Sequence, residues 1–191
     1  TGKTKGNHWD FTRFNPKHFQ HIENCIRRLG ELGIEADLIM MHPYDRWGFS
    51  QMTKEQDDLY WNYAVARFSA FANVWWSLAN EYDLMPHKAI QDWERYASIL
   101  CEKDPYHHMR SIHNCVSLYD FSRPWITHCS VQRTDLYKSS EITNELRERY
   151  HKPVVLDEIA YEGDIQHGWG NLTGEEMLRR FWEAACRGGY P

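Results

Sequence analysis

The chain has 191 residues, enough for a domain with a sizeable core, a net charge of −5 and a sequence pI of about 6.1. This acidic balance gives no electrostatic support for a nucleic-acid or anionic-membrane partner, and no apolar run reaches transmembrane length. Five scattered cysteines without Cys-x-x-Cys spacing predict free thiols rather than a disulfide framework or a structural zinc site.

Helical and strand patterns alternate along the chain. Periodic apolar residues, N-cap residues and terminal glycines predict helices over 16–32, 53–72, 88–103, 139–150 and 173–187. The short apolar runs between them predict strands over 34–41, 74–80, 109–114, 125–132 and 154–158. Such alternation is typical of a parallel sheet with right-handed crossovers. Because no glycine-rich nucleotide loop follows a strand, a (β/α)₈ TIM barrel is favoured over a nucleotide-binding sheet.

The number of predicted strands is too small for a closed barrel. A complete barrel averages about 250 residues. The sequence therefore predicts an α/β fold with about strands 3 to 7 of a partial TIM barrel, forming a single incomplete domain over residues 1–191. We expect the other strands and any flanking modules to lie outside this chain. Open sheet edges invite pairing, so the isolated chain is expected to self-associate.

Two of the predicted strands end in glutamates. The apolar run 74–79 ends in Asn80 and Glu81, and the run 153–156 ends in Asp157 and Glu158. In α/β barrels, chemistry is placed at the C-terminal ends of the strands. Alternation of side chains along a strand directs Glu81 and Glu158 into the barrel mouth and Asp157 to the opposite face. The sequence therefore predicts a carboxylate pair at the rim of the barrel.

A facing pair of carboxyl groups is suited to glycoside hydrolysis. One group must be protonated to assist the leaving group, and the other must be ionised to attack the anomeric carbon. Proximity separates the two pKa values, because ionising the second group beside the first is unfavourable. A separation of about 5–5.5 Å gives retention of configuration, and roughly 6.5–9.5 Å leaves room for an inverting water.

At this point the chain resembles a known group of enzymes. Asn80-Glu81 followed by a later strand ending in Glu158 is similar to the clan A glycoside hydrolases, which are retaining (β/α)₈ enzymes. The segments 9–16, 42–49 and 168–173 resemble, more narrowly, a bacterial group of endoglucanases or glycosidases described as family 5-like or apiosidase-like. The resemblance covers essentially the whole chain.

The resemblance implies a role for four residues. Glu81 would be the acid/base, Glu158 the nucleophile, Asn80 a hydrogen-bond donor to the substrate 2-hydroxyl, and His128, at the tip of the predicted strand 125–132, a support for the nucleophile. The implied function is retaining hydrolysis of O-glycosidic bonds in an oligo- or polysaccharide, without a cofactor. An arginine on strand two and a tryptophan on strand eight of the clan would lie outside this chain, so the isolated fragment is expected to be inactive.

Further polar and aromatic residues belong to the same predicted rim. Aromatic residues make up 15 % of the chain, which favours either a tryptophan-rich core or a sugar-binding cleft. Predicted substrate-binding side chains are the polar His42, Asp45, His113, Asn114 and Gln132 and the aromatic Trp47, Tyr82 and Trp169. For each of them, a loop hydrogen bond or loop packing is the alternative interpretation.

Two other functions are compatible with the sequence. A metal-dependent hydrolase on a barrel would use His42, His113 and His128 as zinc ligands. A carbohydrate-binding barrel without catalysis would keep the fold but would not need both glutamates. The sequence assigns no sugar, linkage, endo or exo action, or cellular compartment.

Overall fold

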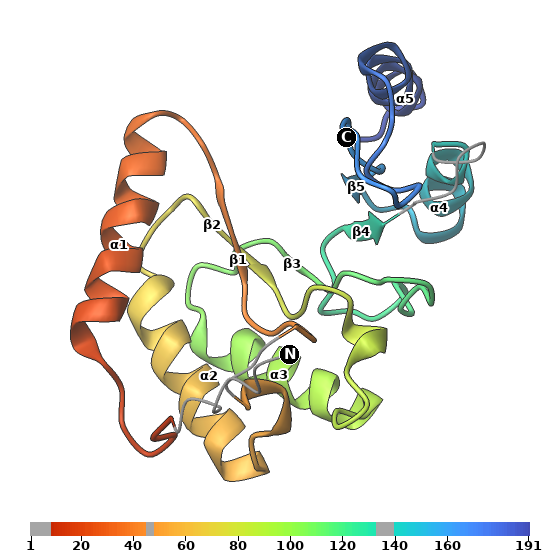
Figure 1. Cartoon of the computed structure of the whole chain (residues 1–191). Helices are drawn as coiled ribbons and strands as arrows, with labels where there is room; N and C mark the ends of the chain where they lie inside the picture. The colour runs from red at the N-terminus through yellow and green to blue at the C-terminus, as the bar shows by residue number, and fades with distance from the viewer. Residues whose placement is uncertain (1–8, 45–47, 133–139) are drawn as a thin grey trace. The chain divides into compact units, whose positions relative to one another are not determined.

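The computed structural model describes residues 9–44, 48–132 and 140–191, which fall into two compact units, 1–109 and 110–191. The elements of both units carry the labels of Figure 1. Among the helices in the described part of the chain, none combines the length and apolar character needed to cross a membrane.

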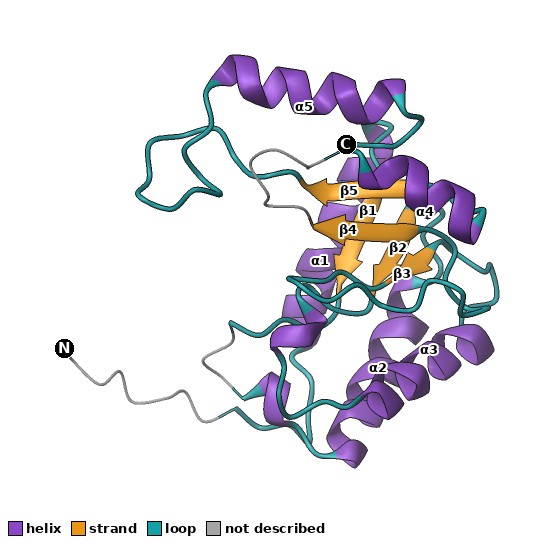
Figure 2. Cartoon of the chain, turned by 90° about the vertical axis from the view of Figure 1, so that its right-hand side faces the viewer, coloured by secondary structure: helices purple, strands orange, loops and turns teal. Residues whose placement is uncertain are grey.

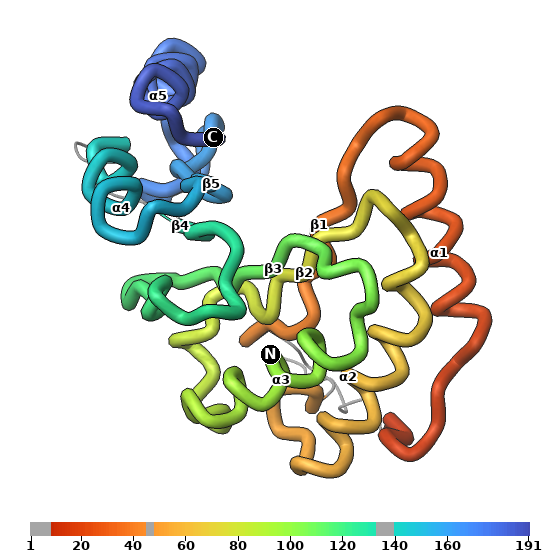
Figure 3. Tube along the Cα trace, turned by 180° about the vertical axis from the view of Figure 1, so that it is seen from behind, coloured from red at the N-terminus to blue at the C-terminus, as the bar shows by residue number. Residues whose placement is uncertain are grey.

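The first unit alternates helices with parallel strands. Its elements are α1 (Pro16–Glu31), β1 (Ala36–Ile39), η1 (Phe49–Gln51), α2 (Lys54–Phe68), β2 (Val74–Ser77), η2 (Tyr82–Leu84) and α3 (Ile90–Lys103). β1 and β2 pair in parallel, with Ala36 opposite Val74 and Ile39 opposite Ser77. Figures 1 and 3 show α2 lying between α1 and α3. The predicted elements are therefore present, with shorter strands.

Side chains at the helix starts explain where α1 and α2 begin. Asn15 accepts hydrogen bonds from the backbone amides of Lys17 and His18, at 3.1 and 3.4 Å, directly before a proline that lacks an N–H. Thr53 and Gln56 form the predicted reciprocal capping box of α2. These contacts span at most three residues, which is why the sequence predicts them well.

Aromatic residues form much of the core of the first unit. Trp61, Trp76, Trp93 and Tyr96 are each at most 1 % exposed. The rings of Trp61 and Tyr96 stack with centroids 4.9 Å apart, and the Trp76 indole donates to Asp104 at 3.1 Å. Much of the unusual aromatic content therefore serves packing, as one of the two sequence interpretations expects.

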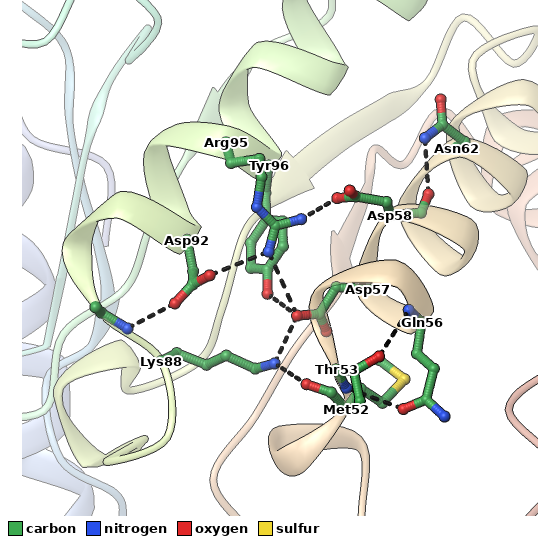
Figure 4. A network of polar contacts seen from close by, with 11 residues as sticks. Met52, Thr53, Gln56, Asp57, Asp58, Asn62, Lys88, Asp92, Arg95 and Tyr96 are labelled. Atoms are coloured by element: carbon green, nitrogen blue, oxygen red, sulfur yellow. Dashed lines mark hydrogen bonds and ion pairs between the residues drawn. The ribbon is translucent and has the colours of Figure 1, made fainter.

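A buried polar network joins α2 and α3 in this unit (Figure 4). Asp57 on α2 accepts from the Lys88 ammonium at 2.6 Å and from the Tyr96 hydroxyl at 2.5 Å. Burial and then the Asp57 hydrogen bond raise the pKa of Tyr96. Arg95 adds ion pairs to Asp57 and Asp58. The network fixes how the two helices meet.

The second unit is built on a parallel strand pair. Its elements are β3 (Arg110–Ser111), β4 (Cys129–Gln132), α4 (Ile142–Tyr150), β5 (Val154–Glu158) and α5 (Gly174–Cys186). Cys129 lies opposite Val154, and Gln132 lies opposite Glu158, with an irregularity between them. Figure 2 shows β4 and β5 side by side. Tyr190, after α5, forms an isolated parallel bridge with Val155 on β5.

Candidate active site

Polar side chains gather at the C-terminal ends of the strands in the second unit. Asn114 accepts from the Gln132 backbone amide at 3.2 Å and donates to the Gln132 carbonyl at 3.4 Å. His113 contacts the Gln132 side chain and, at 3.3 Å, Glu158 Oε1. The strand-end argument thus places His113, Asn114, Gln132 and Glu158 together, although three different segments supply them.

His113 lies at the centre of this cluster. Its Nδ1 is 3.2 Å from Asp157 Oδ2 and 3.3 Å from Ser130 Oγ, and its Nε2 is 3.1 Å from Gln132 Oε1. Burial alone would lower the pKa of His113, but the hydrogen bonds and charges of Asp157 and Glu158 outweigh it and raise the pKa to about 9. The imidazole is therefore protonated at neutral pH.

The same contacts keep Glu158 ionised. Burial acts to raise the pKa of Glu158, yet hydrogen bonds from His113 and Tyr161 and the His113 charge lower the pKa below its ordinary value. The Glu158 side chain keeps 20 % of its accessible surface. A partly accessible, ionised carboxylate at a strand end has the properties that a nucleophile needs.

Glu158 does not lie on the face of β5 that strand alternation assigns to it, whereas Asp157 stays on the face of Val155 and of its partner Ser130. Between Ser130 and Gln132 on β4, the paired residues of β5 advance from Val155 to Glu158, so β5 carries one extra residue. An irregularity of this kind interrupts the alternation of side chains. Asp157 and Glu158 consequently both reach His113, and Ser130 donates a short hydrogen bond to Asp157. The prediction that Glu158 shares the face of Val154 and Leu156, opposite Asp157, was wrong.

His128 also differs from its predicted position. β4 begins at Cys129, so His128 precedes the strand and Gln132 occupies its tip. His128 is buried, its Nδ1 is 3.0 Å from Thr127 Oγ1, and desolvation lowers its pKa to about 4 despite the opposing Asp157 charge. The placement at the strand tip was wrong because residues before Cys129 form a turn, with the Ile126 amide bonded to the Arg123 carbonyl.

The other predicted glutamate lies in the first unit, in an unusual backbone conformation. β2 ends at Ser77, and Glu81 has φ 47° and ψ 55°, the left-handed region. A non-glycine residue there is uncommon, and such strain clusters at functional sites. Glu81 is only 5 % exposed, and the Asn80 amide donates to its Oε2 at 3.5 Å. Strand alternation therefore does not extend to Glu81, and a local turn sets its direction instead.

The predicted aromatic and loop residues have varied surroundings. Tyr82 is buried with its ring edge-on to Trp93, which favours the packing interpretation, whereas Trp169 is 46 % exposed and stacks on His167. His42 stacks with Tyr44 at a centroid distance of 6.5 Å. Asp45 and Trp47 lie outside the described residues.

Sequence reasoning missed three members of the cluster: Asp157, Ser130 and Tyr161. The adjacent acids at the end of β5 were a visible signal, but the choice between them depended on a regular strand. Tyr161 hydrogen-bonds Glu158 and packs edge-on to Trp169, with centroids 6.0 Å apart. It links the ionised carboxylate to the exposed tryptophan.

The zinc alternative finds little support in the described residues. No group of three histidine, cysteine or acidic side chains suited to a metal ion occurs among residues 9–44, 48–132 and 140–191. Both ring nitrogens of His113 already face oxygen atoms of neighbouring side chains. This histidine therefore has no free nitrogen with which to bind a metal.

Comparisons with known proteins connect the chain to one family and to solved structures. The family of apiosidase-like catalytic domains matches residues 1–190. A solved candidate glycoside hydrolase from Bacteroides vulgatus is 42 % identical, with a TM-score of 0.92, over 98 % of this chain and 38 % of that one. A family 5 glycoside hydrolase from the same organism is 16 % identical, with a TM-score of 0.67, over 98 % of this chain and 45 % of that one. No curated protein matches.

Two points follow from these similarities. They confirm the predicted fold class, an α/β chain that forms part of a (β/α)₈ barrel. The chain spans less than half the length of either solved structure.

Proposed function

Because this chain belongs to the family of apiosidase-like catalytic domains, we propose that it hydrolyses O-glycosidic bonds of an oligo- or polysaccharide with retention of configuration. Glu158 is the nucleophile and Glu81 the acid/base. The observation that carries the proposal is the environment of Glu158, whose pKa the neighbouring His113 imidazolium and Tyr161 hydroxyl lower. A double displacement requires that carboxylate to be an anion before substrate arrives.

The same mechanism assigns a role to each of the remaining residues. In the first step Glu158 attacks the anomeric carbon while Glu81 protonates the departing oxygen. In the second step Glu81 takes a proton from water, which displaces Glu158 and restores the anion. Asn80 donates to the substrate 2-hydroxyl, and exposed Trp169 presents a ring face to the apolar face of a sugar. His42, Asn114 and Gln132 contribute hydrogen bonds to substrate hydroxyls.

Azide rescue tests the two roles separately. With activated aryl glycosides, Glu158→Ala should lose turnover and regain it with azide, which enters from the side of the missing carboxylate and gives a glycosyl azide of inverted configuration. Glu81→Ala should still form the glycosyl-enzyme, and azide should then give a product of retained configuration. Glu145→Gln on α4, an exposed position, is the matched control and should keep wild-type turnover.

The length of the protein under test matters. This chain should be assayed beside a protein extended to the length of its Bacteroides relative, because it spans only 38 % of that structure. We expect turnover from the longer protein and none from the isolated chain. If the longer protein hydrolysed no glycoside faster than its Glu158→Gln variant, the proposed function would be wrong.

A further inference from the structure

The ring of His113 faces acceptors on both sides. Nδ1 approaches Asp157 Oδ2 and Nε2 approaches Glu158 Oε1, at 3.2 and 3.3 Å. An ionised carboxylate can only accept a hydrogen bond, so both ring nitrogens must donate. A neutral imidazole has one donor and would leave one carboxylate facing a lone pair. Two ionised carboxylates, one near each ring nitrogen, are therefore best matched by an imidazolium.

The residues beside the ring support the same protonation state. The Ser130 hydroxyl donates a hydrogen bond to Asp157, which leaves a lone pair on its oxygen to accept from His113 Nδ1 at 3.3 Å. The side-chain oxygen of Gln132 accepts a hydrogen bond from His113 Nε2 at 3.1 Å. The His113 side chain is 5 % exposed, so little water competes with these contacts.

We propose that His113 is a positioning residue: as an imidazolium clamped between Asp157 and Glu158, it holds the Glu158 carboxylate ionised and in one orientation. Asp157 and Ser130 act through His113 by fixing its ring and its charge. The proposal rests on the proposed function only in taking Glu158 as the nucleophile.

The arrangement has a consequence for the two displacement steps. Glu158 loses its charge when its oxygen bonds to the anomeric carbon, and regains the charge when water breaks that bond and the electron pair returns to the carboxylate. A cationic donor at 3.3 Å is attracted most strongly to the charged form. His113 therefore favours departure of Glu158 in the second step and shortens the life of the glycosyl-enzyme.

Few charged groups surround His113 in the described part of the second unit. Asp157 and Glu158 face the ring from β5, and His128, before β4, interacts with Asp157. Because the pKa of His128 is about 4, this second histidine is neutral near pH 7 and does not compete for the carboxylates. The pKa of His113, about 9, agrees with the imidazolium assignment.

The test is a nuclear magnetic resonance titration that does not require activity. With ¹⁵N-labelled histidine and ¹³C-carboxyl-labelled glutamate in the whole chain, both His113 nitrogens should carry protons at pH 7.5. Glu158 should titrate below the ordinary glutamate pKa of 4.5. This part uses the wild type, so it does not depend on the folding of any variant.

Two variants separate charge from shape. His113→Gln keeps a neutral N–H donor near Glu158 but removes the positive charge. The pKa of Glu158 should therefore rise by about 1 unit or more. Asp157→Asn keeps the shape at the other nitrogen and should lower the titration midpoint of His113. Glu145→Gln should move neither. An unprotonated His113 nitrogen at pH 7.5, or a Glu158 titration unchanged in His113→Gln, would overturn the proposal.

Kinetics of the extended protein distinguish the two proposals. If His113 shortens the life of the glycosyl-enzyme, His113→Gln should lower kcat and KM together, because the covalent intermediate accumulates. A merely structural role would lower kcat without lowering KM, and would count against the inference. If the titrations give the expected pKa values but no glycoside is hydrolysed, the positioning role of His113 is supported and the proposed function is wrong.

Discussion

Replacing Lys88 by methionine should destabilise the first unit severely. Lys88 Nζ lies 2.6 Å from Asp57 Oδ2 with both side chains only 2 % exposed, and it also donates to the Met52 carbonyl at 2.9 Å (Figure 4). Methionine fills most of the space of the lysine stem but leaves Asp57 without its main counter-charge. Removing one partner of a buried ion pair costs about 3–5 kcal/mol of unfolding free energy.

An exposed pair at the same distance is the matched control. Arg28 Nη1 lies 2.6 Å from Glu31 Oε2 on α1, but the two side chains are 71 % and 53 % exposed. Solvent screening limits such a pair to less than about 1 kcal/mol. The Lys88→Met variant should therefore lose at least about 2 kcal/mol more than Arg28→Met, which is roughly a thirtyfold larger change in the unfolding constant.

Urea unfolding followed by circular dichroism measures both variants. For a chain of this length, a loss of 3–5 kcal/mol corresponds to a fall in melting temperature of roughly 6–20 °C. The double variant Asp57→Asn/Lys88→Met should recover part of the loss, because no unpaired charge remains. Equal changes in Lys88→Met and Arg28→Met would refute the reasoning, since burial would then not determine the cost.

Two further predictions concern pH and helix capping. Desolvation holds the pKa of His128 at about 4 in the folded state against an ordinary value of 6.5, so the unfolded chain binds the proton first as pH falls. The contribution of His128 to the unfolding free energy should be fully present above pH 6.5 and should decline between pH 6.5 and 4, by at most about 1.4 kcal/mol per pH unit. The unfolding free energy of His128→Gln should decline less across that range. Identical pH profiles for the wild type and this variant would count against the assignment. Thr53→Ala removes the cap of α2 and should cost about 1 kcal/mol in the same urea assay, with serine at that position retaining most of the stability.

The order of helices and strands could be predicted from the sequence because the signals are local. Asn15, Thr53 and Thr173 each accept a hydrogen bond from a backbone amide two or three residues ahead, so residues within one helical turn determine where the helix starts. The strand-end argument also succeeded for His113, Gln132 and Glu158, since parallel strands bring their carboxyl ends to one edge.

The direction of the acidic side chains could not be predicted in the same way. Alternation describes a strand with regular pairing, and pairing depends on a partner far away in sequence. β5 carries an extra residue opposite β4, which brings Glu158 beside Asp157 at His113, and Glu81 adopts left-handed backbone angles beyond the end of β2. Neither departure leaves a local signal such as a glycine.

The sequence by itself determined the family resemblance, the alternating elements and the two candidate glutamates. Only the tertiary structure decided that Asp157 joins Glu158 on one imidazolium, that His128 precedes its strand, and that Tyr82 packs in a core. The physical reason is that protonation and burial depend on neighbours supplied by other segments. His113 and Asp157 are 44 residues apart, and the charge of that histidine follows from the contact between them.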